Sequence, residues 1–169
     1  MCIRDSKYLG SYLQKETGAD MLLWDSACVV HEEFKASGLR DLKKLHPDAG
    51  VLVHPESPSE VISMADAVGS TSYLIKASRD LDFNKFIVAT DKSIFYKMTQ
   101  LSPEKEFFEA PTGGSGSSCK SCAHCPWMGL NSLTNLDECV KTLANEIKLD
   151  SSLIQKAKVP LDKMISFNV

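Results

Sequence analysis

Three cysteines recur at intervals of three residues in the segment CKSCAHCPWM, at Cys119, Cys122 and Cys125. Thiolates at this spacing on one loop can converge on a single metal, and a CxxCxxC run with a proline nearby is typical of iron–sulfur ligation. A closed zinc site takes four ligands, usually as two pairs, whereas this run supplies three thiols and a constrained His124. The run therefore predicts a metal or iron–sulfur site and leaves the choice between iron and zinc open.

A further cysteine, Cys28, follows an apolar run, and His31 lies three residues beyond it. A lone cysteine is most often a small buried hydrophobe, but its position after a predicted strand and near a histidine favours a functional role. Cys139, within a predicted helix, is expected to be a core or surface residue. Because no export signal is visible, we expect a reducing compartment, where metal or redox chemistry is more frequent than disulfides.

Two further polar groups suit chemistry at the ends of elements. His54 and Glu56 flank Pro55 directly after an apolar run; a histidine and a carboxylate this close can form a general acid–base pair, with a solvated turn as the alternative. Ser70 and Thr71 offer hydroxyls and backbone N–H groups that suit a phosphate or carboxylate at a helix start. An ordinary helix N-cap explains the same two residues equally well.

The elements that must position these side chains alternate between short apolar runs and longer amphipathic segments. The runs predict strands buried on both faces, at residues 21–24, 50–53 and 85–89. The amphipathic segments predict helices, at residues 32–46, 58–68, 93–101, 131–148 and 160–167. Ser57 and Glu60 give the second of these helices a capping-box pattern. This alternation predicts parallel sheets with helical crossovers.

Parallel sheets bind ligands at the carboxyl ends of their strands. Cys28 and His31 follow the first predicted strand, His54 follows the second, and Thr90 with Asp91 follows the third. We therefore expect one site at this edge. His46 is expected to be structural, and both tryptophans, Trp24 and Trp127, are expected in the core.

The composition excludes several classes of function. With a net charge of −3 and no basic patch, the chain lacks the positive field that nucleic-acid binding requires. No apolar run approaches the roughly 20 residues that cross a bilayer, so we expect no membrane association. The opening segment MCIRDS is expected to form no element, and Cys2 to have no chemical role.

The motifs LLWDSACVVHEEF, VLVHPESP, ADAVGSTS, FIVATDKSIFYKM and CKSCAHCPWMGLN, taken together and in this order, resemble those of the quinolinate synthase family. The resemblance runs from about Lys7 to the C-terminus. It implies an α/β fold made of two three-layer α/β/α sandwich domains with short parallel sheets, the second and third of the family's three similar domains. The expected division is residues 1–6 as a non-native-looking segment, 7–84 as the second domain, and 85–169 as the third with a helical tail.

The resemblance also implies a reaction and a cofactor. Quinolinate synthases are cytoplasmic enzymes that condense iminoaspartate, the product of L-aspartate oxidase, with dihydroxyacetone phosphate to quinolinate, releasing phosphate and water. Their [4Fe–4S] cluster has an open iron that acts as a Lewis acid, and each domain supplies one cysteine ligand. By motif, Cys28 and Cys125 match two of these ligands, whereas Cys119 and Cys122 match a redox-sensitive pair found in part of the family.

The remaining matches assign the polar residues at the strand ends. His54 and Glu56 are implied in proton transfer, His31 in orienting substrate, and Ser70 and Thr71 in holding phosphate or carboxylate groups. Because the family's first domain is not recognisable, the chain is interpreted as a fragment that is inactive alone. The alternatives are a small ferredoxin-like electron carrier that uses the CxxCxxC run and a zinc-stabilised structural module.

Overall fold

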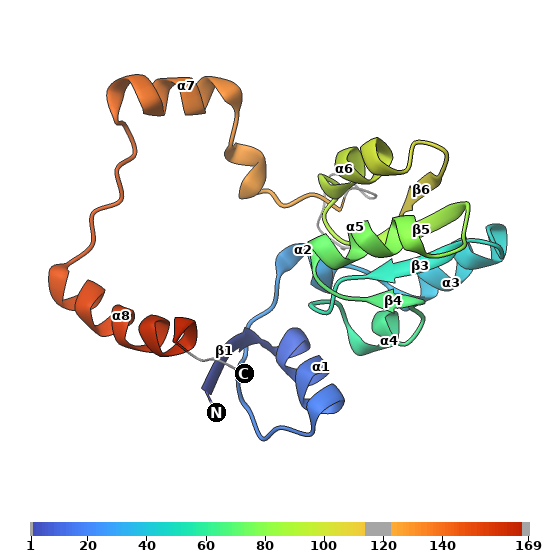
Figure 1. Ribbon diagram of the computed structural model, residues 1–169, viewed down its shortest axis with the longest axis horizontal. Coiled ribbons are helices and arrows are strands. Elements are labelled where there is room, and N and C mark those ends of the chain that lie inside the picture. Colours follow the sequence, from blue (N-terminus) through green and yellow to red (C-terminus); the bar gives the residue numbers. More distant parts are fainter. Residues whose placement is uncertain (1, 114–122, 167–169) are drawn as a thin grey trace. The chain divides into compact units, whose positions relative to one another are not determined.

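The structure is a computed structural model that describes residues 2–113 and 123–166. The chain divides into two compact units, Met1–Pro126 and Trp127–Val169, and each is described by itself. Figure 1 traces the first unit from blue to yellow and the second in orange and red.

A four-stranded parallel sheet forms the centre of the first unit, in the order β4-β3-β5-β6. Its strands are β3 (Gly50–Val53), β4 (Ala67–Val68), β5 (Lys85–Ala89) and β6 (Glu106–Glu109). The two central strands pair in register from Gly50 opposite Phe86 to Val53 opposite Ala89. All four residues of β3 are buried, as the continuous apolar run predicts for a strand covered on both faces.

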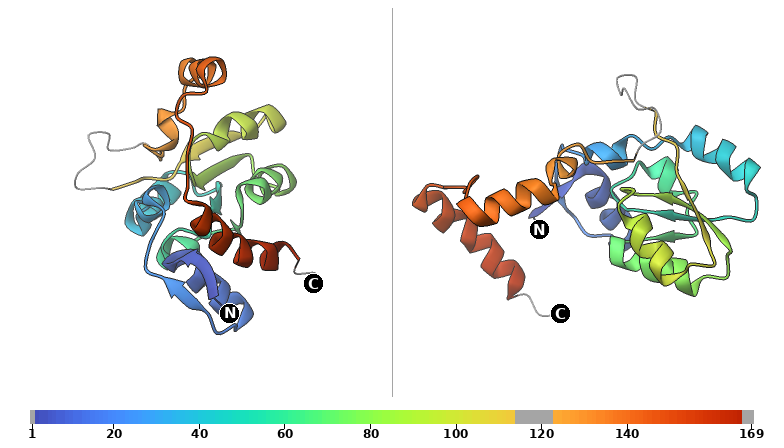
Figure 2. Two further views of the ribbon diagram at one scale, coloured as in Figure 1. Left: turned by 90° about the vertical axis from the view of Figure 1, so that its left-hand side faces the viewer. Right: turned by 90° about the horizontal axis from the view of Figure 1, so that it is seen from above.

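Helices cover both faces of this sheet, as the view from above in Figure 2 shows. Because successive side chains of a strand point to opposite faces, Val51, Val53 and Ile87 pack on one side, whereas Leu52, Phe86 and Val88 pack on the other. The first side is covered by α2 (Val29–Glu32), α3 (Ala36–Leu45) and α4 (Ser59–Ile62). The second is covered by α5 (Thr71–Asp80) and α6 (Ile94–Leu101). The predicted α/β/α layering with a short parallel sheet is confirmed.

A separate two-stranded parallel sheet opens the chain, made of β1 (Cys2–Ser6) and β2 (Leu22–Trp24) with α1 (Lys7–Thr17) between them. The expectation that MCIRDS forms no element is therefore wrong. The predicted core position of Trp24 is wrong too, because its side chain is 71% exposed. Its strand, β2, pairs only with β1 among the described strands. Gly10 allows α1 to approach β2, because a Cβ there would overlap Cδ2 of Leu23.

Two predicted helices of the first unit have different bounds in the structure. The segment 32–46 is split between α2 and α3, with Phe34 buried between them at 2% exposure. The segment 58–68 is helical only through Ile62, because Ala67 and Val68 pair with β3 as the edge strand β4. The capping box is not formed: Pro58 occupies the N-cap of α4, and the hydroxyl of Ser57 is buried without a hydrogen-bond partner.

The second unit contains η1 (Met128–Leu130), α7 (Leu133–Thr142) and α8 (Ser151–Ile165). Ser132 and Asp150 cap the N-termini of α7 and α8 with side-chain oxygens. Pro160 lies inside α8 rather than at a helix start. Trp127 is 72% exposed and is not a core residue. None of the helices described here is long and apolar enough to cross a membrane.

The domain boundary that the family resemblance implies, between residues 84 and 85, lies inside the first compact unit. It separates α5 from β5, and β5 pairs directly with β3. Where two sandwiches were expected, the described residues form one four-stranded sheet with helices on both faces and a two-stranded pair. The assignment of these parts to the family's second and third domains stays a prediction.

Candidate functional site

The carboxyl ends of β3 and β5 form the centre of the candidate site. The chain leaves β3 toward β4 on one side and leaves β5 toward β6 on the other. Such a reversal creates a crevice outside the carboxyl ends of the two central strands, where ligands of α/β sheets bind. His54 follows β3, and its backbone N–H donates to the carbonyl of Ala89 at 3.1 Å, at the end of β5. Thr90 follows β5 directly.

His31 reaches this crevice from α2. The residue is 7% exposed, and its Nε2 lies 3.1 Å from the hydroxyl of Thr90. Its Nδ1 lies 3.1 Å from Oε2 of Glu56, an ion-pair distance. The ring stacks on His54 with centroids 4.4 Å apart and planes inclined by 20°. The structure therefore brings together His31, His54 and Glu56.

Glu56 is shared by the two histidines. Its Oε2 lies 3.1 Å from Nδ1 of His31 and 3.8 Å from Nδ1 of His54. The adjacent His31 holds the pKa of Glu56 below its ordinary value of 4.5, against the opposing effect of burial. A carboxylate that is ionised at neutral pH and lies beside two imidazoles can accept a proton from a substrate.

Cys28 lies beside the same carboxylate. It occupies the N-cap position of α2 in an extended conformation, and its thiol is free. Ligand atoms of Cys28, His31 and Glu56 all lie within 4.8 Å of one another. We call these three residues the Cys28–His31–Glu56 group. A thiolate, an imidazole and a carboxylate this close form a candidate metal-binding set.

Cys125, like Cys28, has a free thiol. Like Cys28, it is partly buried and packs against the core that contains Val30, Val53 and Ala89. Its backbone N–H donates to Oδ2 of Asp91 at 2.8 Å. Burial raises the pKa of Asp91, but the N–H groups of Ser93 and Cys125 outweigh this and leave it below its ordinary value. The ionised Asp91 thus anchors the segment that carries Cys125.

Thr90 and Asp91 were expected at this edge, but their roles were not. Thr90 fixes one nitrogen of His31 from 59 residues away, and Asp91 holds the backbone of Cys125 from 34 residues away. The sequence signal that pointed to both residues was their position directly after a predicted buried strand.

Ser70 and Thr71 lie at the carboxyl end of the edge strand β4. Ser70 caps α5 by accepting from the N–H of Tyr73 at 3.3 Å, and Thr71 is the first residue of that helix. Both are exposed. They share the edge of the sheet with His54 but lie outside the Cys28–His31–Glu56 group.

Of the remaining cysteines, the structure describes the side chain of Cys139, in the second unit. Cys119 and Cys122 lie outside the described part of the chain. Cys139 lies in α7, and its thiol donates to the carbonyl of Ala144 at 3.3 Å. This local contact at the helix end is consistent with the structural role expected for Cys139.

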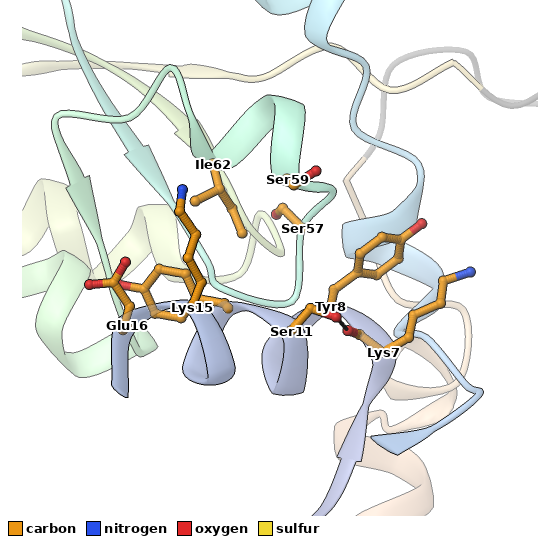
Figure 3. A pocket seen from close by; sticks show the side chains of 9 residues that line it. Lys7, Tyr8, Ser11, Lys15, Glu16, Ser57, Ser59 and Ile62 are labelled. Atoms are coloured by element: carbon orange, nitrogen blue, oxygen red, sulfur yellow. Dashed lines mark hydrogen bonds between the residues drawn. The ribbon is translucent and has the colours of Figure 1, made fainter. Parts of the chain in front are cut away.

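A pocket of about 320 Å³ lies next to the site, between α1 and the turn that leads into α4 (Figure 3). It is lined by Lys7, Tyr8, Ser11, Tyr12, Lys15, Glu16, Ser57, Ser59 and Ile62. Two residues of the pocket contact Glu32, which follows His31 in α2. Lys7 forms an ion pair with Glu32 at 2.9 Å, and the hydroxyl of Tyr8 donates to Glu32 at 3.3 Å. On the opposite wall, Ser57 follows Glu56 and is fully buried. The pocket is thus lined by Ser57, which follows Glu56 in the sequence, and by two residues that contact Glu32, which follows His31.

Fold and site together define an α/β/α protein in which cysteine, histidine and glutamate side chains meet at the carboxyl edge of a parallel sheet. Comparison with protein families makes the class specific: the sequence model of the NadA family, quinolinate synthetase A protein, matches residues 3–166. The chain belongs to this family. Membership implies an enzyme of quinolinate synthesis, from a family known for an iron–sulfur cluster, and does not favour a separate electron carrier.

Proposed function

We propose that this chain supplies part of the active site of a quinolinate synthase, which condenses iminoaspartate with dihydroxyacetone phosphate and releases phosphate and water. The observation that carries the proposal is the meeting of His31, His54 and Glu56 at the carboxyl edge of the sheet. These residues come from two segments of a chain that belongs to the family. Iminoaspartate would be supplied by an L-aspartate oxidase.

Proton transfer is the role that the geometry supports for Glu56 and His54. Condensation requires removal of a proton from carbon next to the carbonyl of dihydroxyacetone phosphate, and later loss of water requires protonation of a leaving hydroxyl. Glu56 is ionised and suits the first task, and His54, 3.8 Å away, suits exchange of that proton. His31, held by Thr90, orients a substrate carboxylate or hydroxyl. Ser70 and Thr71 hold phosphate or carboxylate groups at the start of α5.

Cys28 and Cys125 are the proposed ligands of a [4Fe–4S] cluster. The donor set fits in part, because both thiols are free, partly buried and packed against the same core. When bound, the cluster supplies an open iron that polarises substrate oxygens. A third thiolate would come from the family's first domain, and Cys119 with Cys122 would form a redox-sensitive pair. For this reason we expect the 169-residue chain to form no quinolinate by itself.

The test joins this chain to the first domain of a family member and measures quinolinate formation after anaerobic loading with iron and sulfide. Glu56→Gln is expected to lower kcat by about 10²–10⁴-fold, the usual contribution of a general acid–base group. Glu60→Gln is the matched control, since Glu60 is exposed on α4. Equal activity of both variants would refute the role of Glu56, and activity of the chain without the added domain would refute the requirement for a third ligand.

A further inference from the structure

The segment that carries Cys125 is attached to the end of β5 by two hydrogen bonds. The backbone N–H of Cys125 donates to Oδ2 of Asp91 at 2.8 Å. Two residues earlier, the carbonyl of Ala123 accepts from the backbone N–H of Lys92 at 2.7 Å. Adjacent residues that follow β5 thus fix two positions of the cysteine segment.

The core of the first unit restrains the same segment. Ala123 is 1% exposed and belongs to the core that contains Val53 and Ala89, and Cys125 packs against this core. The backbone is therefore held on both sides of His124, which is exposed. Because the Cα–Cβ bond of a residue leaves the chain in a direction set by its backbone, the contact with Asp91 helps to set the direction of the Cys125 side chain.

The two donors that meet at Asp91 require a carboxylate. Oδ2 accepts from Cys125, and Oδ1 accepts from the backbone N–H of Ser93 at 2.9 Å. An amide offers one acceptor oxygen and one NH₂ group, so Asp91→Asn would leave one of the two N–H groups facing another donor. The contact with Ser93, just before α6, fixes the carboxylate so that its second oxygen faces Cys125.

The same stretch of backbone positions a second residue of the candidate site. Thr90 directly precedes Asp91, and its hydroxyl lies 3.1 Å from Nε2 of His31. Two consecutive residues after β5 therefore hold the ring of His31 and the backbone of Cys125. Partners that orient the ligands of a metal site typically contribute about 10–100-fold to metal affinity.

We propose that Asp91 is a positioning residue for the iron–sulfur cluster, which directs the thiolate of Cys125 for cluster binding. The inference rests on the proposed function, in which Cys125 is a cluster ligand. Asp91 acts through the backbone of Cys125 and not as a ligand itself. Its removal should release the cysteine segment while the parallel sheet stays intact.

The first test measures how fast iodoacetamide labels each thiol of the reduced 169-residue chain, read by mass spectrometry. The background carries Cys119→Ser and Cys122→Ser, so that Cys125 is the one thiol left in the CxxCxxC run. Asp91→Ala should raise the labelling rate of Cys125 about 10-fold or more, because a hydrogen bond to a charged acceptor is lost. Cys28 packs against the same core and should be labelled at an unchanged rate. An equal rise at both thiols would indicate general loosening of the fold and would overturn the positioning role.

The second test joins the chain to the first domain of a family member and follows the visible absorption of the cluster during incubation with an iron chelator. Asp91→Ala should lose the cluster about 10–100-fold faster than the wild type, and Asp91→Asn should also lose it faster. Asp82→Ala is the matched control, since Asp82 is an exposed aspartate of the same unit, and it should keep the wild-type rate. Circular dichroism checks the folding of each variant.

The variant Cys125→Ser separates this inference from the proposed function. If Cys125→Ser abolishes the cluster while Asp91→Ala retains it as long as the wild type, the role of Asp91 is wrong and the ligand assignment stands. If Cys125→Ser retains the cluster, the ligand assignment itself is wrong, and the role of Asp91 is overturned with it.

Discussion

At the scale of the residue, the site depends on contacts between side chains that are distant in the sequence. His54 and Glu56 are two positions apart, and their pairing was predictable from HPE alone. The contact of His31 with Thr90 joins residues 59 positions apart, and no local pattern contains it. Sequence motifs thus named three residues that the structure brings together, His31, His54 and Glu56, whereas the contact with Thr90 that orients His31 required the folded chain.

The lowered pKa of Glu56 makes the stability of the first unit depend on pH. The carboxylate is stabilised in the folded state by His31, so its contribution is fully present above the ordinary pKa of the unfolded chain. That contribution is lost as the pH falls below about 4.5 and through the lower pKa of the folded state. Glu56→Gln should remove this part of the pH dependence.

The measurement is the free energy of unfolding by urea for both proteins between neutral pH and pH 3. The variant should show a shallower decline below pH 4.5 than the wild-type chain. Glu60→Gln again serves as the control, because Glu60 is exposed. Parallel declines for wild type and Glu56→Gln would contradict the ion-pair assignment.

At the scale of the element, the sequence predicted the parts that are fixed by continuous apolar runs. The central strands at 50–53 and 85–89 agree with β3 and β5 because both faces of each strand are buried. The edge strand β4 was missed, since its two residues become a strand only by pairing with β3. The strand β6 was missed as well, because Glu106 and Glu109 interrupt the apolar pattern. Edge elements are set by their neighbours more than by their own composition.

Leucines on β3 and β2 offer a matched comparison of the two sheets. Leu52, on β3, is fully buried against the helices α5 and α6, whereas Leu22, on β2, is 72% exposed. Leu52→Ala should lower the free energy of unfolding by about 2–5 kcal/mol, because it creates a cavity in a packed core. Leu22→Ala should change it by less than about 0.5 kcal/mol. Urea unfolding followed by circular dichroism measures both, and equal losses would show that β2 is as buried as β3.

At the scale of the whole molecule, stability is expected to be concentrated in the first unit. That unit contains two packed cores, whereas neither α7 nor α8 contains a buried residue. Apolar side chains such as Leu133, at 86% exposure, and Ile147, at 84%, lie open to solvent in the second unit. Helices of 10 and 15 residues are marginal in water without tertiary packing, because most helical stability in proteins comes from burial of an apolar face.

Hydrogen exchange followed by mass spectrometry tests this difference along the intact chain. Amides of β3 and β5 should exchange slowest, near the rate set by global unfolding, whereas amides of α7 and α8 should exchange faster by several orders of magnitude, through local opening. The helix α5, with Leu74 and Ala77 buried, is the internal control, since it is as short as α7 but packed on the sheet. If α7 were protected as strongly as α5, its apolar residues would have to be buried in solution, and the exposed second unit described here would be wrong.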